Sequence, residues 1–127
     1  MERVFWLLSG INGFLAVALG AFGAHGLRGR LSGAPDGARR LEVWETAAQY
    51  HFMHALALGL AAYLCSRSSL GSATATGYLF QAGIVIFSGS LYLLAITGVT
   101  KLGMITPIGG LCFLAGWCAL IWTAAKL

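Results

Sequence analysis

Residues 73–96 read ATATGYLFQAGIVIFSGSLYLLAI and contain no charged side chain. A helix that rises 1.5 Å per residue needs about 20 apolar residues to cross a hydrocarbon core of about 30 Å. This stretch is therefore long enough to cross a bilayer. Three more apolar stretches of similar length occur at residues 4–24, 44–65 and 104–125. The sequence predicts an all-α integral membrane fold with four spanning helices.

The overall composition also indicates that the chain lies in a lipid bilayer. Charged residues make up 9% of the chain, whereas a soluble domain carries about 25%. So few charges cannot cover a surface that faces water. The net charge of +4 is not arranged as a basic stripe, so we expect no nucleic acid partner. We expect Lys and Arg to mark the edges of the membrane and to contact lipid there.

The connections between the four stretches predict their arrangement. They are short enough for a single domain, residues 1–127, folded as an up-down-up-down bundle with both termini on one side. The longest connection, residues 26–43, contains a turn at Pro35-Asp36-Gly37, with Asp36 expected at a helix N-cap and Trp44 expected at the membrane interface. One side of the membrane then carries Arg28, Arg30, Arg39, Arg40 and Lys101, and the other carries Arg3, Arg67 and Lys126. This excess favours a cytoplasmic location for the first and third connections.

Small residues recur at helical spacing and predict close helix contacts. In lipid the hydrophobic effect does not drive helices together. Small side chains let two backbones approach closely, and the resulting van der Waals contact stabilises the helix pair. The candidate packing residues are Ala16, Gly20 and Ala24 in the first span, Gly59 in the second, and Gly109, Gly110 and Gly116 in the fourth. The pattern does not distinguish contacts within one chain from contacts between subunits.

Polar side chains inside the spans are the candidate functional residues, because polar groups in a membrane are costly. The candidates are His25, His51, His54, Ser88, Ser90 and Tyr92. Counted from the side of the first connection, His51 lies about 10 Å deep and His54 about 15 Å, with the third-span hydroxyls at about 8–14 Å. We therefore expect one polar cluster in that half of the bilayer, with His54 facing the segment from Ser88 to Tyr92. Asn12 and Gln81 are expected to form hydrogen bonds between helices.

Two interpretations of this cluster stay open. In the favoured one, His51 and His54 bond hydroxyls or carbonyls across helix interfaces, and His25 bonds free carbonyls at a helix end. In the other, the cluster binds a ligand, a proton or a metal. His51 and His54 supply only two ligands of one metal, whereas zinc sites usually need three or four. We predict no metal, no cofactor and no catalytic residue, and therefore no enzyme.

The chain also resembles a known family. The segments that carry the resemblance are Ala18–Gly26, Tyr50–Ala57, Leu79–Tyr92, Thr106–Gly110 and Leu114–Trp117. They look like those of the YgdD-like family, small inner-membrane proteins of unknown function from bacteria with mitochondrial relatives. The resemblance implies a four-helix fold in a bacterial plasma membrane and carries over no activity. By resemblance, the signature positions are Gly20, Gly23, His25, His54, Ser88, Gly89, Ser90, Tyr92, Pro107, Gly109 and Gly110, with His51 as a further member.

Two classes of function follow. The first is a structural or accessory component that self-associates or joins a larger membrane complex. The second is a protein that binds or transports a lipid, quinone or small solute through the polar cluster. The small size of the chain favours the first, because four short helices leave little interior volume.

Overall fold

The computed structural model describes residues 1–127 and contains helices and no strands. Its helical segments join into four continuous rods. The first rod comprises α1 (Glu2–Phe22), the π-helical turn η1 (Gly23–Leu27) and α2 (Arg28–Leu31), and the second is α3 (Gly37–Arg67). The third rod comprises α4 (Gly71–Gly83), the π-helical turn η2 (Ile84–Ser88) and α5 (Gly89–Thr97). The fourth rod comprises the 3-10 turn η3 (Thr100–Met104) and α6 (Thr106–Ala125).

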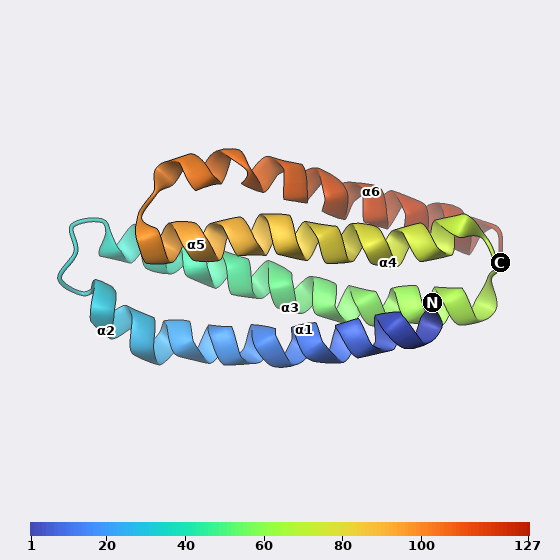
Figure 1. Cartoon of the computed structure of the whole chain (residues 1–127), viewed down its shortest axis with the longest axis horizontal. Helices are drawn as coiled ribbons and strands as arrows, with labels where there is room; N and C mark the ends of the chain where they lie inside the picture. The colour runs from blue at the N-terminus through green and yellow to red at the C-terminus, as the bar shows by residue number, and fades with distance from the viewer.

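The four rods lie side by side along the long axis of the molecule (Figure 1). Both termini lie at one end with the α3–α4 turn, and the α2–α3 and α5–α6 connections lie at the other. Three rods are long and apolar enough to cross a membrane, namely Glu2–Leu31, Gly71–Thr97 and Thr100–Ala125. The rod formed by α3 is not one of the three, so the predicted span at residues 44–65 stays a prediction.

The position of α3 explains its lower apolarity. It holds eleven of the buried residues of the chain, including His51 and His54. Many of the others are alanines, such as Ala57 and Ala61, which leave space for side chains of the surrounding rods. The helix face that packs against protein does not need the strongly apolar side chains of a face that meets lipid. The polar and small residues of α3 therefore suit an interior position.

The helices extend beyond the predicted spans. The first rod continues to Leu31 and α3 begins at Gly37, so the first connection is much shorter than residues 26–43. Asp36 is the N-cap residue as predicted, although its side chain caps no backbone amide and instead lies 3.6 Å from Arg40. Residues such as Arg28 and Arg39 are good helix formers, so a helix can continue past the apolar stretch into the polar edge of the membrane.

Arg40, near the start of α3, caps the C-terminal end of the third rod. Its Nε donates a hydrogen bond of 2.8 Å to the carbonyl of Ala95, and its Nη2 donates to the carbonyl of Ile96. These carbonyls have no partner within α5, and a cation is favourable at the negative end of a helix dipole. Gly98 follows with a positive φ of 73°, a conformation that suits glycine and ends the helix. The start of α3 is thereby tied to the end of α5.

Trp44 is buried, so the expectation that it lies at the membrane interface is wrong. Its Nε1 donates a hydrogen bond of 2.7 Å to the carbonyl of Leu19, and its ring packs against Phe22 and Tyr92. Because Leu19 lies within the first rod, the indole joins this rod to α3. It does not anchor the chain to lipid headgroups.

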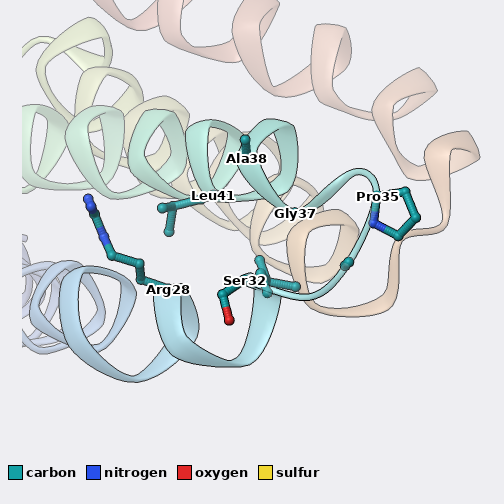
Figure 2. Close-up of a pocket in the computed structure, with 8 residues that line it drawn as sticks. Arg28, Ser32, Pro35, Gly37, Ala38 and Leu41 are labelled. Atoms are coloured by element: carbon teal, nitrogen blue, oxygen red, sulfur yellow. The ribbon is translucent and has the colours of Figure 1, made fainter.

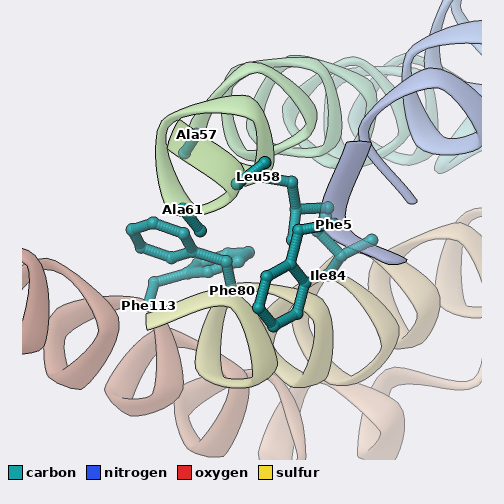
Figure 3. Packing of buried hydrophobic residues seen from close by; sticks show 8 residues of the cluster. Phe5, Ala57, Leu58, Ala61, Phe80, Ile84 and Phe113 are labelled. Carbon is teal, nitrogen blue, oxygen red and sulfur yellow. The ribbon is translucent and has the colours of Figure 1, made fainter. Parts of the chain in front are cut away.

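The main hydrophobic core surrounds α3. Figure 3 shows Phe5, Phe80 and Phe113, which come from three different rods, beside the small side chains of α3 such as Ala57 and Ala61. Large rings from the outer rods thus fill the space that the alanines leave. This arrangement packs the rods closely without large side chains on the central helix.

The small residues predicted to pack fall into three groups. Ala16, Gly109 and Gly116 are buried, as expected. Gly20, Gly59 and Gly110 are half-buried, with Gly20 facing Ala48 and Gly59 facing Trp6 and Ser9. Ala24 is exposed, so no contact within this chain uses it, and its predicted packing role stays a prediction. In the π-helical turn η1, Gly23 and Leu27 are buried and Ala24 faces outward between them.

We predict that Gly109→Ala destabilises the protein and that Gly110→Ala does not. A Cβ at Gly109 would collide with the backbone of Phe87, whereas one at Gly110 would lie 4.0 Å from the Phe87 ring, an ordinary contact. Overpacking of this kind costs about 1–3 kcal/mol. Thermal unfolding in detergent should show a lower midpoint for Gly109→Ala alone. Equal midpoints for the two variants would contradict the close contact of α6 with η2.

Candidate functional site

His51 lies at the centre of a chain of side-chain hydrogen bonds that joins the first, second and third rods. Its Nδ1 is 3.0 Å from the hydroxyl of Tyr92, and its Nε2 is 3.0 Å from Oδ1 of Asn12. Asn12 Nδ2 in turn donates to Oε1 of Gln81 at 2.8 Å. The His51 side chain is buried, with 4% of its surface exposed. The predicted interhelical role of Asn12 and Gln81 is confirmed by these contacts.

The partners of Asn12 determine the protonation pattern of His51. Asn12 Nδ2 also donates to the backbone carbonyl of Leu8 at 2.8 Å. A carbonyl can only accept, so this bond sets the orientation of the amide and directs Oδ1 toward the imidazole. His51 Nε2 must then carry the hydrogen and donate it. In the neutral ring, Nδ1 is the acceptor and the hydroxyl of Tyr92 donates to it.

His54 forms a second, separate set of contacts. The indole Nε1 of Trp117 donates to His54 Nε2 at 3.1 Å. Because indole is only a donor, Nε2 must be unprotonated, and Nδ1 donates to the carbonyl of Tyr50 at 2.8 Å. The imidazole also stacks on the ring of Phe113, with 3.6 Å between ring centroids. With 2% of its surface exposed, His54 is enclosed by α3 and α6.

The position of His54 in the interior agrees with the sequence, but its predicted partner is wrong. It contacts Trp117 of α6, and it is His51 that reaches Tyr92. Residues three apart on a helix point about 60° away from each other, because each residue turns the helix by about 100°. In this structure His51 bonds Asn12 of α1 and Tyr92 of α5, whereas His54 bonds Trp117 of α6.

The remaining predicted cluster residues lie in different environments. Ser88 is buried and donates to the carbonyl of Ala47 at 2.9 Å, which joins η2 to α3. Ser90 bonds Thr106 at 2.6 Å and so joins α5 to α6. His25 is exposed in η1 and forms no side-chain hydrogen bond, so its assignment to the cluster is wrong. The first rod continues past it to Leu31, and His25 faces outward there.

The structure brings together residues that the sequence could not pair. Trp117 is a hydrogen-bond partner of His54, although the sequence showed it only as one apolar residue of the fourth span. Asn12 and Gln81 were recognised as interhelical groups, but nothing in their spacing connected them to His51. Periodicity reports which face of one helix a residue occupies, and it carries no information about the partner helix. These pairings therefore depend on the bundle.

The geometry favours hydrogen bonding between helices over acid–base or metal chemistry. No buried side-chain nitrogen or oxygen lacks a hydrogen-bond partner. No three His, Cys, Asp or Glu side chains lie close enough to hold a metal ion. His51 and His54 each use both ring nitrogens in the neutral form. A metal could bind only if Trp117, Tyr50, Asn12 or Tyr92 gave up its bond.

Two cavities open at membrane level on opposite sides of α3. One, of about 550 Å³, lies between α3 and α6 beside Tyr50 and His54. The other, of about 360 Å³, lies between α1 and the third rod beside Asn12, Gln81 and Tyr92. Both fall in the size range of small-molecule sites, about 300–1,000 Å³.

A further hollow of about 320 Å³ lies outside the apolar spans, at the connection between α2 and α3 (Figure 2). Arg28 lines it from α2, Ser32 from the connection that follows α2, and Leu41 from α3. The guanidinium of Arg28 lies 3.9 Å from the carboxylate of Glu45, and both side chains are largely exposed. This hollow therefore holds one exposed ion pair and no convergent set of polar groups.

Comparison with known proteins gives consistent matches along the chain. The family described as "Protein of unknown function (DUF423)" matches residues 19–110. The UPF0382 membrane protein YwdK of Bacillus subtilis is 50% identical over 125 residues, which covers 98% of each chain. The UPF0382 membrane protein SAB0533 of Staphylococcus aureus is 44% identical over 119 residues, covering 94% of this chain and 93% of the relative. No solved structure matches.

We predict that Tyr92→Phe destabilises the protein and that Tyr50→Phe does not. Each change removes one hydroxyl from a tyrosine within the apolar region, but only the Tyr92 hydroxyl has a hydrogen-bond partner. Removing it leaves His51 Nδ1 without its donor, and an interhelical bond in a membrane is worth about 0.6 kcal/mol on average. Thermal or denaturant unfolding of both variants checks this. An equal loss of stability in both would mean that the His51–Tyr92 bond contributes nothing specific.

Proposed function

The chain belongs to the family of proteins of unknown function DUF423, and we propose that it is a non-enzymatic membrane component that self-associates or joins a larger membrane complex. Its relatives are named membrane proteins, and three of its rods are long and apolar enough to span. It is a multi-pass protein of the bacterial plasma membrane. No relative named above is called YgdD-like, so that narrower resemblance stays a prediction.

One observation carries the proposal: the buried polar groups bond one another across the rods. Asn12, His51 and Tyr92 link three rods in one chain of hydrogen bonds, and Trp117 links the fourth through His54. General acid–base catalysis needs a side chain that can exchange a proton with a substrate within hydrogen-bond reach. Both nitrogens of each imidazole are instead occupied by protein atoms. Such a network supports a role in holding the helices in register.

The outer surfaces of the bundle support the second half of the proposal. Large apolar side chains stand outward on α1 and α6, including Phe14 with 74% of its surface exposed and Ile121 with 65%. Gly13 on α1 has open space where a side chain would stand. These surfaces are available to lipid, to a second copy of the chain or to a larger complex. Small residues that no internal contact uses are suited to an approaching helix.

The membrane topology is part of the same proposal. We infer that all four rods cross the bilayer in alternating directions, with both termini on one side. The positions of the termini and of the connections in Figure 1 support this arrangement. The positive charges near the first and third connections favour the cytoplasm for that end.

Reporter fusions test the topology. A compartment-sensitive reporter after Leu127 should report the periplasmic or outer side, and one inserted between Ser32 and Ala38 should report the cytoplasm. The insertion falls in the connection between α2 and α3, where no helix is interrupted. Fusions that report the same compartment would rule out an odd number of spans between the two sites and so contradict the bundle topology, which has three spans there.

Photo-crosslinking in native membranes tests the association. A photoreactive amino acid at Phe14 of α1 or Ile121 of α6 should give a discrete protein adduct, because both positions face outward. The same probe at Ala57, which is buried in the bundle, is the matched control and should give no adduct between chains. Adducts with lipid alone from both outward positions would contradict association with a protein partner.

A further inference from the structure

The cavity between α1 and the third rod has a mostly apolar lining, with a few polar side chains at its floor. Asn12, Gln81 and Tyr92 contribute to the floor, and Ile11, Leu15 and Val85 form an apolar rim. The rim side chains are exposed on the outer surface, where a membrane protein meets lipid. The cavity therefore joins the hydrocarbon of the bilayer to the hydrogen-bond chain of His51.

The floor of this cavity retains unused hydrogen-bonding capacity. Gln81 accepts a bond from Asn12 through Oε1, and this bond leaves its Nε2 with two N–H groups that no protein atom accepts. Tyr92 donates its hydroxyl hydrogen to His51, which leaves the oxygen free to accept. Unsatisfied polar groups are costly where water is absent. The floor is thus complementary to a molecule that presents a hydrogen-bond acceptor, such as a carbonyl oxygen.

The depth and charge of the cavity restrict its occupant. Gln81 lies ten residues after Gly71, about 15 Å along the helix, which is near the middle of a hydrocarbon core of about 30 Å. No charged side chain lines the cavity. A phosphate or an ammonium group would have no counter-ion at this depth. The head of the occupant must be uncharged, and its tail must follow the apolar rim into the bilayer.

We propose that this cavity binds a membrane quinone, an uncharged lipid whose flat head carries two carbonyl oxygens and whose tail is apolar. One carbonyl accepts a hydrogen bond from Gln81 Nε2, and the ring lies against Ile11 and Leu15. The proposal concerns binding alone and includes no electron transfer. It is independent of the association proposed above, since the cavity lies within one chain.

Gly89 offers a way to close the cavity without disturbing the fold. It lines the cavity, has ordinary helical angles, and has nothing within 4 Å of the position of an added Cβ. Gly89→Leu therefore fills the space. Gly10→Leu adds the same side chain to another helical glycine with open space, and Gly10 does not line the cavity. The two variants form a matched pair.

The test measures binding of decylubiquinone to the full chain in phosphatidylcholine nanodiscs, by saturable quenching of tryptophan fluorescence. We expect saturable quenching in the wild type, binding at least tenfold weaker for Gly89→Leu, and binding within twofold of wild type for Gly10→Leu. Gln81→Met, which keeps the length of the side chain and removes its N–H groups, should also weaken binding. Thermal unfolding should show that both glycine variants remain folded.

Two results would overturn the proposal. The first is an absence of saturable quenching in the wild type, or equal binding by wild type and Gly89→Leu. The second comes from native mass spectrometry of the same samples. A phospholipid retained by the wild type and Gly10→Leu but lost from Gly89→Leu, without saturable quinone binding, would show that the cavity holds a phospholipid tail and not a quinone.

Discussion

The side-chain amide of Asn12 is the group on which the polar interior depends. Its Nδ2 is held by the carbonyl of Leu8 on its own helix and by Gln81 of α4, which leaves only Oδ1 for His51. That choice sets the tautomer of His51, and the tautomer sets the direction of the bond from Tyr92. In water each of these bonds could be exchanged for a bond to solvent. In a bilayer no water is available for such an exchange. Removing one of these side chains therefore leaves its hydrogen-bond partners unsatisfied, and the helices must keep the register in which all these hydrogen bonds form.

Packing around α3 reinforces this register. The central helix presents alanines, such as Ala57 and Ala61, to phenylalanine rings from the surrounding rods. The fourth rod approaches η2 so closely at Gly109 that a single added methyl group would meet the Phe87 backbone. Because there is no hydrophobic driving force for helix association in lipid, close van der Waals contacts and hydrogen bonds must hold the bundle together. Both are present in the same region, where His54 stacks on Phe113 and bonds Trp117.

The members of the hydrogen-bond network differ in how accessible they are. His51 and His54 are enclosed and bonded on both ring nitrogens, which supports a role in stability. Gln81, at the end of the hydrogen-bond chain, accepts a bond from Asn12 and also lines a cavity with an apolar rim. A bundle with little interior volume can therefore still offer a site at its lipid-facing side, where the bilayer itself supplies the ligand. An accessory component with such a lateral site needs no catalytic residue and no passage through its centre.

The sequence by itself determined the membrane as solvent, the helical class and most of the helix-packing glycines, because apolar length and small-residue spacing are local properties of one helix. It also identified His51, His54, Ser88, Ser90 and Tyr92 as interior polar groups from their estimated depth. It was wrong to place His25 in the polar cluster, since the first rod continues past it to Leu31 and leaves its side chain exposed. Only the tertiary structure decided that His51 meets Tyr92 and Asn12 while His54 meets Trp117. The physical reason is angular: two residues three positions apart differ by about 60° around the helix axis, and which neighbour stands in each direction depends on how the other rods pack.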